Sequence, residues 1–217
     1  MTRSATTIIA ALAPLFIGSM FSAGPVTAAD YFQAAESRSA TCPLQAKVGE
    51  PAPNFSLDAV IGKEFKKVSL TDYRGKWVVL FFYPLDFTFV CPTEIRGFNE
   101  KLDAFKELNA VVIGASVDSK FSHLAWIQRG DLGDLKYPLL SDFKKEVAER
   151  YGILDNKEGV ALRGLFIIDP DGVLQYQLVH NLSVGRSVKE TLRVLEALQS
   201  GELCPIGWHK GEKTLGK

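Results

Sequence analysis

The sequence predicts an α/β fold with a central mixed β-sheet and helices on both faces. Short runs of β-branched and aromatic residues alternate along the chain with segments whose apolar residues recur every three or four positions. Late in the chain, the turn sequence Asp169-Pro170-Asp171-Gly172 joins two such runs directly. This turn predicts an antiparallel hairpin beside strands that are otherwise connected through helices.

Short runs of apolar, β-branched and aromatic residues predict the strands. The first pair, around Leu57 and Phe65–Val68, is expected to form a hairpin. The seven apolar residues Trp77–Tyr83 end at Pro84, which is typical of a central strand that is buried on both faces. Further strands are expected at Ala110–Val117, Leu165–Ile168 and Val173–Val179.

Helical periodicity separates these strands. The segment Thr93–Leu108 carries apolar residues at helical spacing, and Ser187–Leu198 does so behind a serine that can cap the helix. Shorter helices are expected at Phe121–Gln128 and Lys144–Tyr151. The simplest arrangement of these elements is a thioredoxin-like α/β sandwich.

Length and composition favour one domain and exclude several classes of partner. A chain of 217 residues that is 47% hydrophobic can bury one substantial core. Its 25 basic and 25 acidic residues cancel, so we expect neither a nucleic acid nor an anionic membrane surface as partner. Three scattered histidines and three widely spaced cysteines match no metal-ligand spacing, so we expect no metal and no cofactor.

The N-terminal residues are typical of an export signal. No charged residue occurs from Ala5 to Ala29, and small residues end this apolar stretch. We therefore expect a signal peptide over residues 1–29, cleaved near Ala28 or Ala29, and an exported protein that is periplasmic or secreted. An uncleaved membrane anchor and an organellar transit peptide are the alternatives. After the signal peptide, we expect a flexible leader at 30–47, a domain at 48–203 and a C-terminal tail at 204–217.

Cys91 stands where a buried strand gives way to an amphipathic helix. Ligands of open α/β sheets bind outside the carboxyl ends of the strands, and the loop before Cys91 lies there. Pro92 suits the first helical position, which makes Cys91 the expected N-cap residue. A sulfur at a helix N-terminus faces unpaired amide donors, so its thiolate is favoured and the cysteine becomes reactive.

Ionisation alone is not enough for a fast nucleophile. An ordinary thiol is about 3% ionised at pH 7, so full ionisation gains roughly 30-fold, about 2 kcal/mol. Other groups must orient the attacked bond and stabilise the departing oxyanion. Thr88 is close to Cys91 in sequence, Pro84 can shape and dry the pocket, and Arg163 is permanently charged. The sequence by itself does not determine which way Arg163 faces.

The pattern Pro84-x-x-x-Thr88-x-x-Cys91 is similar to the active-site motif of the peroxiredoxins. The resemblance, to the typical two-cysteine subfamily, covers roughly residues 48–210. This subfamily includes thioredoxin peroxidases and the peroxidase component of bacterial alkyl hydroperoxide reductase. Further matching segments are Phe81–Ile95, Ser122–Trp126, Arg163–Asp169 and Val184–Val188.

The resemblance implies a thiol-specific peroxidase that reduces hydrogen peroxide and organic hydroperoxides. It also assigns roles by position. Cys91 would be the peroxidatic cysteine, Thr88 and Arg163 its activating partners, Pro84 the pocket shield, and Glu94 and Arg186 a supporting charge network.

Cys204 follows the last expected helix in a segment that resembles the resolving-cysteine motif. The resemblance implies that the Cys91 sulfenic acid condenses with Cys204 of the partner subunit in an obligate homodimer, before further oxidation. The first turn of the helix after Cys91 would unwind to allow this. A thioredoxin-like or flavoprotein donor would reduce the disulfide, and five dimers could assemble into a ring.

Two other classes of function remain open from the sequence. A thiol-disulfide oxidoreductase on the same fold would place a second cysteine three residues after the first, where this chain has Glu94. A chaperone-like scaffold would accompany catalysis rather than replace it. Cys42 matches neither catalytic position; it is expected to be a dispensable tail thiol, an interchain bridge or, least well matched, a lipid attachment site.

Sensitive relatives carry a Gly-Gly-Leu-Gly loop and a C-terminal Tyr-Phe segment that slow disulfide formation. This chain has Gly130-Asp131-Leu132-Gly133 and ends at Lys217 without that segment. The resemblance therefore implies resistance to sulfinic inactivation.

Overall fold

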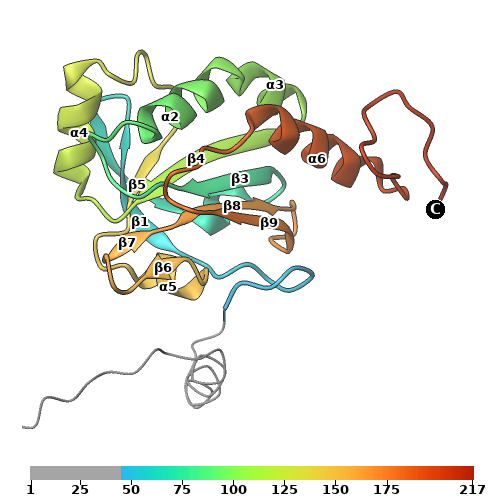
Figure 1. Ribbon diagram of the computed structural model, residues 1–217, viewed down its shortest axis with the longest axis horizontal. Coiled ribbons are helices and arrows are strands. Elements are labelled where there is room, and N and C mark those ends of the chain that lie inside the picture. Colours follow the sequence, from blue (N-terminus) through green and yellow to red (C-terminus); the bar gives the residue numbers. More distant parts are fainter. Residues whose placement is uncertain (1–44) are drawn as a thin grey trace, which may run out of the picture. The chain divides into compact units, whose positions relative to one another are not determined.

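The computed structural model describes residues 45–217 of the chain (Figure 1). The expected signal peptide, Cys42 and most of the expected leader lie outside the described residues. Within 45–217, seven strands form one sheet in the order β2-β1-β5-β4-β3-β8-β9. Their bounds are β1 Ser56–Ile61, β2 Glu64–Ser69, β3 Trp77–Phe82, β4 Ala110–Ser116, β5 Leu139–Ser141, β8 Arg163–Ile168 and β9 Leu174–His180. Two short strands, β6 Leu154–Asp155 and β7 Val160–Ala161, pair separately.

The sheet is mixed, as the sequence predicts. Strand β4 is parallel to both β3 and β5, whereas the pairs β3–β8, β8–β9, β1–β2 and β1–β5 are antiparallel. The predicted central strand is β3, which lies between β4 and β8. Its side chains are buried on both faces, because Val78, Leu80 and Phe82 join one core cluster while Val79 and Phe81 join the other.

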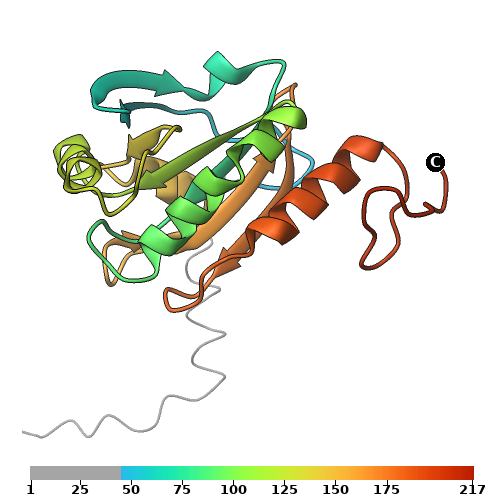
Figure 2. The same ribbon diagram turned by 90° about the horizontal axis from the view of Figure 1, so that it is seen from above.

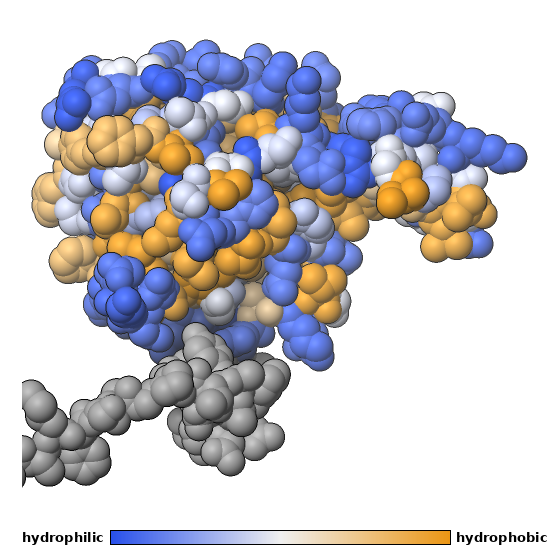
Figure 3. Space-filling model, in the orientation of Figure 1, coloured by the Kyte–Doolittle hydropathy of each residue, from blue (hydrophilic) through white to orange (hydrophobic). Residues whose placement is uncertain are grey.

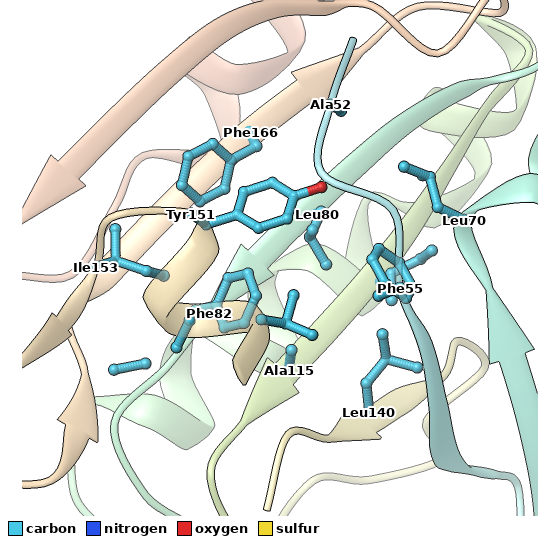
Figure 4. Close-up of a cluster of buried hydrophobic side chains, with 14 of the residues drawn as sticks. Ala52, Phe55, Leu70, Leu80, Phe82, Ala115, Leu140, Tyr151, Ile153 and Phe166 are labelled. Atoms are coloured by element: carbon cyan, nitrogen blue, oxygen red, sulfur yellow. The ribbon is translucent and has the colours of Figure 1, made fainter. Parts of the chain in front are cut away.

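Helices cover both faces of the sheet unequally (Figures 1 and 2). Four helices pack on one face: α2 Cys91–Glu100, α3 Leu102–Glu107, α4 Lys120–Arg129 and α6 Val188–Ser200. The 3₁₀ helix η1 Leu70–Tyr73 and the short α5 Glu146–Arg150 lie on the other. Figure 4 shows this second core, in which the Tyr151 and Phe166 rings meet edge to face at 4.7 Å beside Phe82. This packing fixes the end of β3, from which the active-site loop departs.

The structure corrects one predicted helix. The segment Thr93–Leu108 forms two helices, because the chain turns at Lys101, whose N–H donates to the carbonyls of Phe98 and Asn99. Both helices still bury apolar residues in the same core, so the periodicity continues across the break. Helix α2 also begins earlier than predicted, with Val90 as N-cap and Cys91 as the first helical residue. Pro92 is tolerated there because first-turn N–H groups have no intrahelical partner.

The first described residues contact the domain, whereas the last ones form a tail. Ala46, within the expected leader, donates its N–H to the Arg150 carbonyl at 2.9 Å. After α6 the tail curls beyond the end of that helix (Figure 2). Among the described residues, none of the helices has the length and apolar character needed to span a membrane.

Candidate active site

The loop between β3 and α2 carries Cys91 to a buried position. The thiol lies at the first helical position of α2 with no exposed surface. Phe87, in the middle of the loop, has φ of 56°, so the backbone turns sharply there. This turn places Cys91 behind the carboxyl end of β3, the sheet edge predicted from the sequence.

Arg163 reaches Cys91 because β8 runs antiparallel to β3. The first residue of β8 therefore lies near the end of β3, beside the loop. Its Nη1 is 3.5 Å from the Cys91 Sγ, and its Nε donates to the Leu182 carbonyl at 2.7 Å. The buried guanidinium is therefore within donor distance of the sulfur.

Glu94 binds both arginines one turn after Cys91. Its Oε2 accepts from Arg163 Nη1 at 2.5 Å and from Arg186 Nη2 at 3.0 Å, and its Oε1 accepts from Arg186 Nε at 2.7 Å. Arg186 also donates Nη1 to the carbonyls of Phe82 and Gly164. Both predicted network residues thus meet at the predicted place, and Glu94 occupies the position where an oxidoreductase would need a second cysteine.

Burial and charge compete in this network. Burial alone would raise the pKa of Glu94, but the hydrogen bonds and charge of Arg186, together with the charge of Arg163, hold that pKa below its ordinary value of 4.5. Burial lowers the pKa of Arg186, and Glu94 opposes that shift. The triad therefore holds two guanidinium groups and one carboxylate, which leaves net positive charge beside the Cys91 sulfur.

Thr88 and Pro84 lie in the loop as predicted, but Thr88 is not bonded to Cys91. Its hydroxyl donates to the Leu85 carbonyl at 3.0 Å, and the described residues include no hydrogen bond between Thr88 and the thiol. Pro84 is buried directly after Tyr83. Thr88 would have to rotate its side chain to reach the sulfur or an incoming oxygen.

Cys204 lies far from Cys91 of its own chain. Helix α6 starts beside the active-site loop, since a Cβ on Gly185 would lie 3.4 Å from a Val90 side-chain carbon. The 13 residues of α6 then extend about 20 Å away before the chain reaches Cys204. Both cysteines are free thiols, Cys91 buried and Cys204 partly exposed.

A second polar cluster anchors the loop, and the sequence reasoning missed it. Asp86 accepts from the Tyr83 hydroxyl at 2.9 Å, its Oδ2 lies 2.8 Å from His123 Nδ1, and its N–H donates to Asp118 at 2.8 Å. His123 Nε2 lies 3.0 Å from the Leu140 carbonyl. The available signal was Asp86 itself, a carboxylate set between Leu85 and Phe87 in an otherwise apolar segment.

The comparisons decide the family. The family model described as AhpC/TSA family matches residues 48–177. The chain belongs to this family, the peroxiredoxins. This peroxiredoxin is 54% identical over 177 residues to the chloroplastic 2-Cys peroxiredoxin BAS1 of Hordeum vulgare. The aligned region covers 77% of this chain and 84% of that protein.

Solved structures agree on the fold. The reduced 2-Cys peroxiredoxin of Plasmodium vivax superposes with a TM-score of 0.74 at 46% identity, over 77% of this chain and 91% of that chain. AhpC of Mycobacterium bovis superposes with a TM-score of 0.69 at 42% identity, over 76% of this chain and 99% of that chain. The predicted thioredoxin-like fold is confirmed, and the peroxiredoxin is a thiol peroxidase, an oxidoreductase that acts on peroxides. Within residues 45–217, no three His, Cys, Asp or Glu side chains gather as metal ligands.

Proposed function

We propose that Cys91 is the peroxidatic cysteine and that Arg163 activates it, with Glu94 and Arg186 as the network that orients Arg163. The observation that carries this assignment is the 3.5 Å approach of Arg163 Nη1 to the buried Cys91 Sγ. Thr88 would turn its hydroxyl from the Leu85 carbonyl to the peroxide, and Pro84 would keep water from the pocket.

In the first step, the Cys91 thiolate attacks one oxygen of the hydroperoxide. The O–O bond breaks, the other oxygen leaves as an alkoxide or hydroxide that takes up a proton, and Cys91 becomes a sulfenic acid. Arg163 stabilises the developing oxyanion while it remains bound to Glu94. Hydrogen peroxide and organic hydroperoxides share the reacting group, so both classes are expected substrates.

In the second step, the Cys204 thiol of a partner subunit condenses with the sulfenic acid to form a disulfide and water. The separation of Cys91 and Cys204 by the length of α6 supports pairing between subunits rather than within one. Apolar surface on the projecting tail supports the same arrangement (Figure 3), because Leu203, Ile206 and Leu215 are exposed there and a partner would cover them.

The homodimer is proposed to form through the edge of β9. Strands β2 and β9 are the two edges of the sheet. Strand β2 carries Lys66 and Lys67, charges that discourage edge pairing, whereas β9 has no Lys, Arg, Asp or Glu. An uncharged edge strand favours pairing with a second copy.

A ring of dimers would need a second interface. Exposed aromatic side chains support one: Phe89 in the active-site loop is 94% exposed, and Phe65 on β2 and Phe121 on α4 pack against each other at 5.3 Å while both remain exposed. A solved relative, Plasmodium yoelii Prx1a modified at its N-terminus, is described as an artifactual octamer. We propose that this aromatic surface joins dimers, with five dimers as the expected ring.

The remaining proposals concern location and recycling. We propose export through the uncharged N-terminal stretch, and reduction of the disulfide by a thioredoxin-like or flavoprotein donor in the same compartment. The N-terminal stretch also carries the alternatives of a membrane anchor or an organellar address. Cell fractionation distinguishes these outcomes.

The disulfide mechanism is tested by mixing two variants, both in a Cys42→Ser background so that Cys42 cannot crosslink. Cys91→Ser chains and Cys204→Ser chains are exchanged into mixed dimers and treated with one equivalent of peroxide. A covalent dimer on nonreducing electrophoresis is expected only in the mixture, because each variant supplies one of the two thiols. Absence of that band in dimers shown to be mixed would overturn pairing between subunits.

A further inference from the structure

The C-terminal tail is a closed loop rather than an open extension. The Leu203 N–H donates to the Gly216 carbonyl and the Leu215 N–H donates to the Leu203 carbonyl, both at 2.8 Å. Inside the loop, the Trp208 indole donates to the Glu212 carbonyl at 3.0 Å, and Trp208 is 5% exposed. These bonds join the two ends of the loop around a packed centre, so the loop can move as one unit.

Arg193 ties this loop to α6. Its Nη1 donates to the Trp208 carbonyl at 3.0 Å. Its Nε and Nη2 both bind the carboxylate of Glu190, each at 2.7 Å, which fixes the direction of the guanidinium. No other hydrogen bond among the described residues joins Trp208 to α6.

Cys204 is docked on the end of α6 while the loop is in this position. The Ser200 hydroxyl has one hydrogen, which it donates to the Ala197 carbonyl at 2.7 Å. The Cys204 sulfur lies 3.3 Å from the Ser200 hydroxyl oxygen and donates to the Ala197 carbonyl at 3.8 Å. Cys204 therefore has to leave this position before it can attack.

Gly201 provides the pivot for that movement. It ends α6 with φ of 64°, and a Cβ built there would contact nothing within 4 Å. A chain that swings about Gly201 would carry Cys204 and the closed loop together. Such a swing must break the Arg193–Trp208 hydrogen bond, the Cys204 contacts and the exposed ion pair between Lys210 and Glu196 at 3.8 Å.

We propose that Arg193 is a positioning residue for the resolving step: it clamps the closed loop through the Trp208 carbonyl and so keeps Cys204 docked on its own α6. This inference rests on the proposed role of Cys204 as resolving cysteine. Release of the clamp frees the Cys204 thiol, which attacks the Cys91 sulfenic sulfur. An S–S bond forms, the S–O bond breaks, and the hydroxide combines with the thiol proton to give water.

The clamp has a kinetic consequence. Until Cys204 reacts with it, the Cys91 sulfenic acid can be oxidised by further peroxide to the sulfinic acid. Slower release of Cys204 from its docked position therefore means that more enzyme is inactivated. Removing one hydrogen bond from a charged, partly exposed donor should increase the undocked population about threefold to tenfold. Without the clamp, disulfide formation should therefore accelerate by that factor, and the peroxide concentration for half-inactivation should rise in proportion.

The test compares Arg193→Gln, Arg193→Lys and the control Lys189→Gln, all in the full chain. Lys189 is an exposed cation on the same helix. Stopped-flow fluorescence separates the peroxide step from disulfide formation, and mass spectrometry measures the sulfinic fraction. Arg193→Gln should leave the peroxide step unchanged and accelerate the second step. Arg193→Lys keeps a charged donor at the end of a long side chain, which the shorter Gln does not, so its rate of disulfide formation should lie between those of Arg193→Gln and wild type. Lys189→Gln should match wild type.

Hydrogen exchange at the Leu203 and Leu215 amides and at the Trp208 indole reports the loop without catalysis. Arg193→Gln should leave the two amides protected, because the closed loop moves intact. An unchanged or slower second step in Arg193→Gln would overturn the clamp, as would the same acceleration in Lys189→Gln. If Cys204→Ser still forms the peroxide-dependent disulfide, the proposed resolving role fails instead, whatever Arg193 does.

Discussion

Among individual residues, Glu94 determines how two buried arginines share one site. Its carboxylate neutralises one positive charge and leaves the other beside Cys91. A buried charge that loses its partner is strongly destabilising, whereas an exposed pair contributes little. In the proposed mechanism, the network would therefore couple the stability of the fold to the reactivity of the thiol.

Arg186→Met is expected to lower the free energy of unfolding by about 3–5 kcal/mol. The substitution removes both side-chain bonds from Arg186 to Glu94, keeps the one from the backbone N–H, and leaves the carbonyls of Phe82 and Gly164 without this donor. Urea denaturation measures the change. Lys106→Met, which removes an exposed ion pair with Asp103, is the matched control and should change little. Equally small changes in the free energy of unfolding of both variants would show that the network does not stabilise the fold.

The pH dependence of stability should carry the signature of Glu94. Its folded pKa lies below 4.5, so its contribution is complete above pH 4.5 and is lost as the pH falls through the folded value. Asp118 and Asp142 contribute to the pH dependence of stability with the opposite sign, because burial raises the pKa of each. The difference in unfolding free energy between wild type and Glu94→Gln should therefore shrink below pH 4.5, measured by denaturation from pH 7 to pH 3. Parallel curves would rule out this assignment.

At the level of elements, α2 combines a reactive start with an anchored middle. Arg96 donates to the Asp131 carbonyl at 3.2 Å and Asn99 donates to the Asp134 carbonyl at 2.9 Å. The Lys136 N–H returns a bond to the Asn99 side chain at 3.0 Å. These bonds hold the second half of the helix to the loop after α4, so we expect the opening that the proposed disulfide requires to be confined to the first turn.

Gly97→Ala tests that confinement. A Cβ at Gly97 would meet Val188 at 3.5 Å, an ordinary contact, so the helix gains about 0.5–1 kcal/mol of stability without a clash. Since residue 97 stays helical throughout, disulfide formation in stopped-flow should keep its wild-type rate. The same substitution at Gly130, where φ is 89°, should instead destabilise the protein. A slower second step in Gly97→Ala would show that α2 opens beyond its first turn.

The sequence predicted the elements better than their junctions. Strand β3 was clear because it is apolar on both faces, and α6 because a serine caps a regular stripe. The break at Lys101 was missed because apolar residues keep their spacing across it. Strand β5 was missed because three residues are too few for a period to appear.

The site was predictable only in part for a similar reason. Cys91 and its loop are contiguous in the sequence, whereas Arg163 and Arg186 reach Cys91 and Glu94 through sheet pairing and the approach of α6. Their roles came from resemblance rather than from spacing. The Asp86–His123 contact had no local signal that paired the two residues, since they lie on different elements.

At the level of the whole molecule, the proposed mechanism makes the second cysteine available only through assembly. A chain whose own Cys204 cannot reach Cys91 would depend on a partner for every disulfide. The proposed dimerisation through β9 would therefore belong to the reaction cycle.

The double variant Gln177→Lys/Val179→Lys should weaken the dimer, because two copies would place like charges along adjoining edges. Sedimentation velocity should show a monomer at concentrations where wild type is dimeric. The peroxide step should persist in that monomer, while the covalent dimer disappears. Gln128→Lys is the control, because it adds charge at an exposed site on α4, a helix that packs on β1 and β5 rather than on the β9 edge. A dimer that survives both lysines would exclude β9 as the interface.

We propose that the Sγ of Cys91, activated by Arg163, is the atom that peroxide oxidises. Stopped-flow measurement of hydrogen peroxide consumption by wild type and Cys91→Ser, with a chemical dithiol as reductant, tests it most directly. Wild type should turn over rapidly, and Cys91→Ser should show only background consumption. Turnover in Cys91→Ser equal to that of wild type would contradict it.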